Sequence, residues 1–457
     1  MDDSLKQKDL AHYLHAMTPL AVHEQRGPIV LRSGKGAYVT DVDGKELLDG
    51  FGGLWCLSVG YGQESVIQAA SEQLRRLPYA AAFTHVATET VIELAAKLAS
   101  ITPPSVQHAF FTLGGSDAVE SALKIARYAH AANGDPERRH YVALDWGYHG
   151  SAFVGCAVSG VPYMHPYLGL DFDFVHHIPS HYPYRHAAGP DPQAIIDASV
   201  RAFEAVIAEV GAGKIAAFIT EPFHGAGGVI VPPEGWLTAM QNVCREHGIF
   251  FIVDEVITGF CRTGKFFACE HENLEPDLMT MAKGLTSGYV PMGGVMVSDA
   301  IYRILVDKVP DGMMFAHGFT YSGHPVAAAA ALAVIKLYED GVLEQSARVG
   351  AYLQRRLAEF ADDPWVGDVR GMGMAGALEL VQNKQTKESF PVESRVGFRI
   401  LEAAYGNGLI LRVMGRDVLG FAPPLICTES DIDVLVDRLR RSIDQVRASA
   451  PKRLTRP

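Results

Sequence analysis

A lysine stands directly after an apolar run, where a charged side chain is out of place. Lys283 follows Leu278–Ala282, a run that is typical of a buried strand. Lysine is rarely buried without a partner, and partial removal from water lowers its pKa and makes its amine a nucleophile toward carbonyl groups. Lys283 is therefore a candidate to bind an aldehyde or ketone, although the residue taken alone would be interpreted as a surface lysine.

An acid follows another apolar run in the same way. Asp254 comes directly after Ile249–Val253. Charged groups at the carboxyl edge of a parallel sheet face the crevice in which ligands bind. Asp254 is thus a candidate to bind a cationic group, and an acid that merely ends a strand is the alternative.

Two glycines and a serine separate a third apolar run from a predicted helix. The segment Leu113–Ala118 reads Leu-Gly-Gly-Ser-Asp-Ala, and the helix is expected to begin near Asp117. Glycines let a ligand approach the backbone, and the free N–H groups of a helix N-terminus favour an anion. The pattern predicts a phosphate site in which Ser116 adds a hydroxyl donor, while a helix cap made by Ser116 or Asp117 is the simpler alternative.

The same segment also resembles the nucleophile elbow G-x-S-x-G of hydrolases. Ala118 replaces the last glycine of that motif, and the chain shows no clear catalytic histidine motif after Ser116. A serine hydrolase that uses Ser116 is therefore the remote alternative function.

The three features together indicate one cofactor. Pyridoxal phosphate requires a phosphate anchor, a carboxylate for its pyridine nitrogen and a lysine for its aldehyde. Ser116, Asp254 and Lys283 would supply these groups from one sheet.

The elements that would position these residues alternate along the chain. Continuous apolar runs predict strands that are covered on both faces, at Ala109–Leu113, Tyr141–Leu144, Ala152–Val158, Ile215–Ile219, Ile249–Val253, Leu278–Ala282 and Gly294–Val297. Helical patterns lie between them at Asp117–Ala131, Gln193–Val210 and Glu234–His247. The expected fold class is α/β, with a mostly parallel seven-stranded sheet flanked by helices.

Three parts are expected in a chain of 457 residues. Residues 1–60 are predicted to be an N-terminal segment that packs with the small domain, and residues 61–325 to form the large cofactor-binding domain. After residue 325, long helices are separated by strand-like pieces such as Ala375–Val381 and Leu409–Val413. Residues 326–457 are therefore predicted to form a smaller α/β domain.

At this level of detail the sequence resembles the class III aminotransferases, fold-type I pyridoxal-phosphate enzymes that include ω-amino acid and amine:pyruvate aminotransferases. The resemblance rests on Leu54–Gly62, Gly114–Asp117, Gly147–Gly150, Glu221-Pro222, Asp254–Phe260, Arg262–Gly264, Ala282–Gly284 and Thr320–Pro325. It implies transfer of an amino group from an amine or ω-amino acid to a 2-oxo acid, with pyruvate as the expected acceptor. It also implies a homodimer with shared active sites, or a tetramer built from it.

The resemblance assigns a role to each cofactor residue. It implies that Gly115 and Ser116 hold the phosphate, that Tyr148 stacks on one face of the ring beside His149, and that Val256 covers the other face. Asp254 would pair with the ring nitrogen, and Glu221 would orient Asp254 or the O3′ side of the ring. Lys283 would bind the aldehyde covalently and move the proton. Thr320 would reach the phosphate of the neighbouring subunit.

Substrate residues are implied by the same resemblance. Trp55, Phe83, Tyr148, Tyr163 and Phe319 are expected to line the amine pocket, although each could equally be a core residue. Arg412 follows an apolar run and is expected to bind the substrate carboxylate as a bidentate fork. Arg416 is the second candidate for that role.

Composition excludes some other classes of partner. The formal net charge of −12 disfavours binding to nucleic acid or an anionic membrane, so small-molecule substrates are expected. The first residues show no apolar signal segment, and six scattered cysteines lack a paired spacing, so we expect a cytoplasmic protein. No metal is expected, because His176, His177, His181 and His186 lack ligand spacing within a proline- and tyrosine-rich loop.

The glycine motif at 371–376 fits G-x-G-x-x-G, but a strand-like run follows it, so no dinucleotide site is expected. Within the family, a dialkylglycine decarboxylase or an aminomutase remains the alternative reaction. The amino donor stays open among β-alanine, longer ω-amino acids, diamines and aryl-alkyl amines.

Overall fold

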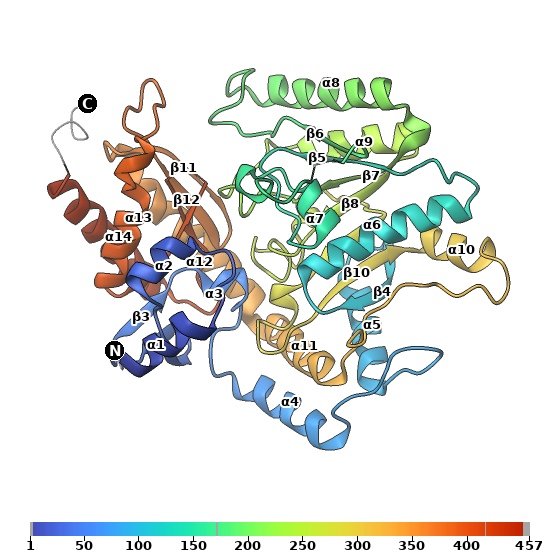
Figure 1. The fold of residues 1–457 in the computed structure, drawn as a ribbon, viewed down its shortest axis with the longest axis horizontal. Coiled ribbons are helices and arrows are strands. Elements are labelled where there is room, and N and C mark those ends of the chain that lie inside the picture. Colours follow the sequence, from blue (N-terminus) through green and yellow to red (C-terminus); the bar gives the residue numbers. More distant parts are fainter. Residues whose placement is uncertain (1–2, 171, 416, 451–457) are drawn as a thin grey trace.

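The computed structural model describes residues 3–170, 172–415 and 417–450. Figure 1 shows a large sheet with helices on its two faces and a second, smaller group of strands and helices beside it. The blue N-terminal residues lie next to the orange and red C-terminal residues (Figure 1).

A seven-stranded sheet forms the centre of the larger part. Its strand order is β4 (Val106–Thr112), β10 (Gly293–Ser298), β9 (Leu278–Met281), β8 (Phe250–Asp254), β7 (Ile215–Thr220), β5 (His140–Leu144) and β6 (Val175–Ile178). Strand β10 is antiparallel to both of its neighbours, and the other pairs are parallel. This confirms the predicted mostly parallel sheet.

Helices cover both faces because successive strand residues point to opposite sides. Ala143, Ile219 and Ile252 pack with α6 (Gly115–Ala132) on one face, where α7 (Phe153–Val158) and α10 (Asp299–Asp307) also lie. Phe218 and Phe251 pack on the other face, which is covered by α5 (Glu89–Ile101), α8 (Pro192–Val210), α9 (Trp236–His247) and α11 (Pro325–Leu337). Two apolar layers therefore hold the sheet rigidly.

One predicted strand is wrong, and one strand was not predicted. Residues 153–158 form α7, because a short apolar run fits a buried helix as well as a strand. The seventh strand is β6, which contains His176 and His177 and lies at the edge of the sheet, where polar side chains are tolerated. These two histidines were expected in a loop.

The C-terminal residues build an antiparallel sheet of order β11 (Val366–Met372), β12 (Ala375–Leu380), β15 (Val418–Phe421) and β14 (Arg412–Met414). Helices α12 (Leu343–Ala358), α13 (Val396–Gly406) and α14 (Glu429–Ala448) accompany it. The glycine motif at 371–376 forms the turn between β11 and β12.

The N-terminal residues form α1 (Asp3–His12), α2 (Leu20–Arg26), β1 (Leu31–Lys35), β2 (Tyr38–Asp41) and β3 (Glu46–Asp49). Strand β3 pairs in parallel with β13 (Leu409–Ile410), so one sheet joins both ends of the chain. Helices α3 (Gly52–Trp55) and α4 (Glu64–Arg76) lead into the larger part. The predicted domain limits at residues 60 and 325 remain predictions.

No helix in the described part of the chain is both long and apolar enough to span a membrane.

Candidate active site

A cavity of about 380 Å³ opens beside the large sheet, where β7, β8 and β9 end and α6 begins. Its wall contains most of the residues that the sequence singled out, namely Gly115, Ser116, Tyr148, His149, Glu221, Asp254, Val256 and Lys283. Their meeting in one cavity follows from the parallel strands, whose carboxyl ends share an edge.

Lys283 lies just beyond the end of β9 and opens a short 3₁₀ turn, Lys283–Leu285. Its φ of +39° is in the left-handed region, which for a residue with a side chain costs on the order of 1–3 kcal/mol and is found mainly at functional sites. Desolvation lowers the pKa of the Lys283 amine, and the nearby Cys56 and Asp254 partly oppose that shift. The amine is therefore more readily neutral, as a nucleophile requires.

Asp254 ends β8, and its carboxylate is buried among three donors. Oδ1 accepts hydrogen bonds from the Thr280 hydroxyl at 2.9 Å and the Val256 N–H at 3.1 Å. Oδ2 lies 2.8 Å from Nδ1 of His149. These bonds fix the orientation of the carboxylate. Thr280 was not predicted as a site residue, because it lies inside an apolar run.

Glu221 is held by two backbone N–H groups. Its Oε1 accepts from the Tyr148 N–H and its Oε2 from the Gly225 N–H, each at 2.9 Å. Desolvation raises the pKa of Glu221 to about 7, the His149 charge opposes that shift, and the Asp254 charge adds to it. Glu221 therefore positions the segment that carries Tyr148 and His149.

The N-terminus of α6 has no side-chain cap. Gly114 is the capping residue, so the expected cap by Ser116 or Asp117 is absent. A Cβ at position 115 would lie 2.7 Å from Cγ1 of Val256, which explains the glycine. The free backbone N–H groups therefore remain available to an anion.

The hydroxyl of Ser116 accepts a hydrogen bond from the Ser151 N–H at 3.0 Å. No histidine in the described part of the chain hydrogen bonds to this hydroxyl, so the serine lacks the base that a hydrolase needs. The hydrolase alternative is thus not supported.

The residues present fit pyridoxal phosphate. An anion site at the start of α6, a buried carboxylate at the end of β8 and an amine with a lowered pKa at the end of β9 face one cavity. The Nε2 atom of His149 is buried without a partner among the described residues, which leaves a polar atom at the wall.

The residues that were predicted to bind substrate do not line this cavity as closely as the cofactor residues do. Trp55 is only 3% exposed, and its ring packs on Phe51 and Phe223 at centroid distances of 4.8 and 6.5 Å. Its neighbours Leu54 and Cys56 line the cavity instead, and sequence reasoning missed both of them.

Tyr163 and Arg412 lie near the cavity without lining it. Desolvation raises the pKa of the Tyr163 hydroxyl, and the Arg412 charge opposes that shift. Arg412 also acts on the pKa of Lys283, which places the guanidinium within electrostatic reach of the amine. It begins β14, opposite Gly420. Arg416 lies outside the described residues.

Phe83, Phe319 and Thr320 do not line this cavity. Phe83 is 44% exposed in the connection between α4 and α5. Phe319 and Thr320 lie in the connection between α10 and α11, and Tyr79 donates a hydrogen bond to the Thr320 carbonyl at 2.8 Å. A single copy of the chain therefore does not bring these three to the cavity.

Comparison with known proteins agrees with this geometry. The family described as aminotransferase class-III matches residues 20–443. A putrescine–pyruvate aminotransferase of Pseudomonas aeruginosa is 41% identical, over 96% of this chain and 95% of that protein. The crystal structure of an (S)-enantioselective omega-transaminase from Thermomicrobium roseum superposes with a TM-score of 0.94 at 40% identity, covering 97% and 99% of the two chains. An omega transaminase from Pseudomonas jessenii, solved in complex with PMP, gives 0.95 at 35% identity, covering 97% and 98%.

Proposed function

The chain belongs to the class-III aminotransferase family, which depends on pyridoxal phosphate, and from this premise we propose that it transfers an amino group from an amine donor to pyruvate. The observation that carries the proposal is the meeting of Lys283, Asp254 and the N-terminus of α6 in one cavity. When bound there, pyridoxal phosphate supplies the aldehyde that accepts the amino group and a ring that withdraws electrons.

Different residues of the cavity bind different parts of the cofactor. The start of α6, with Gly115 and Ser116, binds the phosphate through backbone N–H groups. Asp254 would pair with the ring nitrogen and keep it protonated, because an opposite charge stabilises the charged form. Tyr148 and Val256 form the side walls.

Lys283 has two tasks in this proposal. Its amine holds the cofactor covalently before the donor arrives. When free, the Lys283 amine would move a proton between the donor carbon and the cofactor. The lowered pKa of this buried amine suits this transfer.

Arg412 provides the positive charge that a 2-oxo acid needs. A carboxylate loses free energy when it leaves water unless a charged partner compensates it. The guanidinium lies within electrostatic reach of Lys283 and of Tyr163. A donor without a carboxylate needs no such partner, so one pocket can receive both substrates in turn.

A donor panel tests the proposal. The holoenzyme would be incubated with pyruvate and, separately, with putrescine, β-alanine, a longer ω-amino acid and an aryl-alkyl amine, and alanine formation would be measured. We expect alanine with the diamine and the aryl-alkyl amine, and none with Lys283→Ala. Alanine from none of these donors would overturn the proposal in favour of another reaction of the family.

The proposal includes a homodimer with shared active sites. Support comes from the exposed positions of Phe83 and Thr320 and from large apolar side chains exposed nearby, which are Tyr79, Val86, Ile92, Met313, Met314 and Tyr321. Exposed apolar area of this kind marks an interaction surface.

The six cysteines are free, which fits a reducing cytoplasm.

A further inference from the structure

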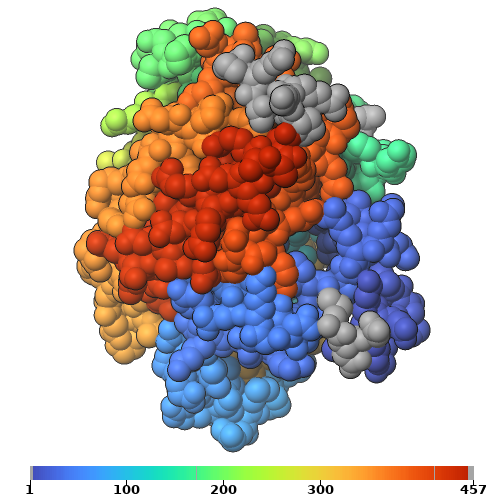
Figure 2. Space-filling model, turned by 90° about the vertical axis from the view of Figure 1, so that its left-hand side faces the viewer, coloured from blue at the N-terminus to red at the C-terminus, as the bar shows by residue number. Residues whose placement is uncertain are grey.

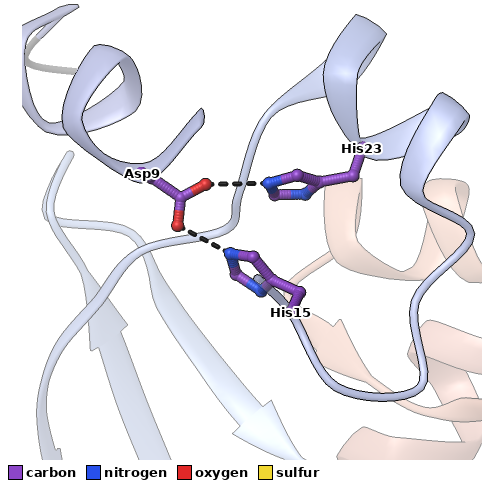
Figure 3. A group of neighbouring side chains, drawn as sticks. All are labelled: Asp9, His15 and His23. Atoms are coloured by element: carbon purple, nitrogen blue, oxygen red, sulfur yellow. Dashed lines mark hydrogen bonds and ion pairs between the residues drawn. The ribbon is translucent and has the colours of Figure 1, made fainter. Parts of the chain in front are cut away.

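Three N-terminal side chains that the proposed reaction does not use converge on one point (Figure 3). Asp9 belongs to α1, His23 to α2, and His15 to the connection between them. Nε2 of His15 lies 2.6 Å from one carboxylate oxygen of Asp9, and Nε2 of His23 lies 2.8 Å from the other. The centroids of the two imidazole rings are 4.2 Å apart. The Nε2 atoms of both rings face the same carboxylate.

The three side chains of this cluster are partly buried, whereas the residues around them are more exposed. The side chains of Asp9, His15 and His23 are between 11% and 23% exposed. Helix α2 has no buried residue, and the apolar side chains of Leu14 and Met17 are largely exposed. In Figure 2 the N-terminal residues, in blue, lie along one margin of the orange and red surface. Apolar burial therefore contributes little to holding α1 against α2.

We propose that Asp9, His15 and His23 form a binding site for a divalent transition-metal ion of the Zn²⁺ type, which ties α1 to α2. Two imidazole nitrogens and one carboxylate are a donor set that Zn²⁺ prefers, whereas Mg²⁺ and Ca²⁺ prefer oxygen donors. Water would complete a tetrahedron as the fourth ligand. This proposal is independent of the aminotransferase reaction.

The distances between the ligand atoms come to suit Zn²⁺ after a small movement of these side chains. The ligand atoms all lie within 4.8 Å of one another. Metal–ligand bonds of about 2.0–2.2 Å place the ligand atoms of a tetrahedron roughly 3.3 Å apart. The two N···O distances of 2.6 and 2.8 Å must therefore open by roughly 0.5–0.7 Å. His15 lies in a connecting segment that can accommodate such a shift.

A second group offers a matched control. Glu204, Glu246 and His247 are the other such cluster among the residues that the structure describes. Glu246 is exposed, and only one of the three donors is an imidazole, so this group is less suited to Zn²⁺. His247→Asn therefore removes a histidine of comparable accessibility without touching the proposed site.

Zn²⁺ binding to the holoenzyme tests the proposal. Titration calorimetry would compare the wild type with His15→Asn, His23→Asn and His247→Asn. We expect one Zn²⁺ per chain in the wild type and in His247→Asn, and affinity weakened at least about 10-fold in His15→Asn and His23→Asn. Equal affinity in all four proteins would overturn the proposal and leave the cluster as a set of hydrogen bonds.

Two further measurements distinguish loss of the metal site from misfolding of the variants. Co²⁺ in a tetrahedral site absorbs in the visible range, and this absorption should appear in the wild type and be lost in His23→Asn. Trypsin cleavage after Lys8 and Arg26 should slow when Zn²⁺ is added to the wild type or His247→Asn, but not to His23→Asn. Equal slowing in all of these proteins would show inhibition of the protease and contradict a link between the helices.

Discussion

At the scale of single residues, Asp254 is constrained more than a carboxylate that simply ends a strand. Thr280, His149 and the Val256 N–H hold both of its oxygens. A carboxylate held in this way can face a ring nitrogen without rotating. The three donors therefore preorganise the charge that the proposed reaction requires.

Asp254→Asn should reduce kcat by at least about 100-fold, or a few kcal/mol of transition-state stabilisation, because an amide cannot keep the ring nitrogen protonated. Thermal unfolding of the variant should change little by comparison. Steady-state kinetics and calorimetry would measure the two effects. Thr280→Val, which removes one donor and keeps the charge, should lose much less activity. A rate for Asp254→Asn within a few-fold of the wild type would show that this acid does not face the ring.

Glu221 should make the stability of the cofactor-free protein depend on pH. Burial raises its folded pKa to about 7, above the ordinary value of 4.5, so the folded state holds the proton more tightly. The stabilisation is therefore fully present below about pH 4.5 and is lost as the pH rises toward 7.

Urea unfolding of the wild type and of Glu221→Gln at pH 5 and pH 7 would measure this effect. The wild type should lose stability over this interval by at most about 3 kcal/mol more than the variant, whose amide does not ionise. Identical pH dependence in the two proteins would show that Glu221 does not titrate in this range.

Arg412 should affect the binding of the acceptor and not that of the donor. Arg412→Ala should raise the KM for pyruvate strongly, because loss of one partner of a buried charge pair costs about 2–5 kcal/mol. The half-reaction with a donor without a carboxylate should change much less. Single-turnover spectroscopy separates the two half-reactions. Equal damage to both would indicate misfolding, and an unchanged pyruvate half-reaction would transfer the role to Arg416 or another cation.

At the scale of elements, the start of α6 depends on the close approach of Val256. This contact leaves no room for a Cβ at position 115, whereas a Cβ at position 114 would meet nothing within 4 Å. Two adjacent glycines therefore differ in what they permit. Only the second one governs how tightly α6 and the segment after β8 enclose the phosphate site.

Gly115→Ala should weaken binding of pyridoxal phosphate at least about 10-fold, since the clash moves the α6 N–H groups away from the phosphate. Gly213→Ala, whose Cβ would also meet nothing within 4 Å and which does not line the cavity, is the matched control and should bind the cofactor as the wild type does. Fluorescence titration of the cofactor-free proteins would give both affinities. Similar affinities in the two variants would show that the contact with Val256 does not shape the phosphate site.

The sequence was most informative where an element ends in a residue that is unusual for its position. Asp254, Lys283 and the glycines before α6 were found because each interrupts an apolar pattern. Thr280 and Cys56 were missed because a threonine in a strand and a cysteine in an apolar stretch break no pattern. Residues 153–158 were misassigned because the length and composition of a short apolar run fit two structures equally well.

At the scale of the whole molecule, Phe83 and Thr320 do not line the cavity within a single copy of the chain. Both are exposed. In the proposed homodimer each site takes Lys283 from one subunit and Thr320 from the other. Such an arrangement can be tested with subunits that carry different defects.

Heterodimers of Lys283→Ala and Thr320→Asp subunits, purified through two different tags, should recover about half of the wild-type activity, because one of the two sites is intact. Each homodimer should be nearly inactive, since one lacks the amine and the other places a negative charge beside the phosphate. Alanine formation would measure this recovery. If Thr320 acted within its own subunit, the heterodimers would show no gain over either homodimer.

The parallel pair of β3 and β13 has a consequence for the order in which the chain can fold. Leu48 pairs with Leu409, a separation of 409 − 48 = 361 residues. During synthesis, β3 must wait with an unpaired edge until nearly the whole chain has left the ribosome, while the seven-stranded sheet, which ends at Ser298, can already assemble. The closing of the N-terminal sheet is therefore a late step, and a chain that is released early leaves β3 exposed to pairing with other molecules.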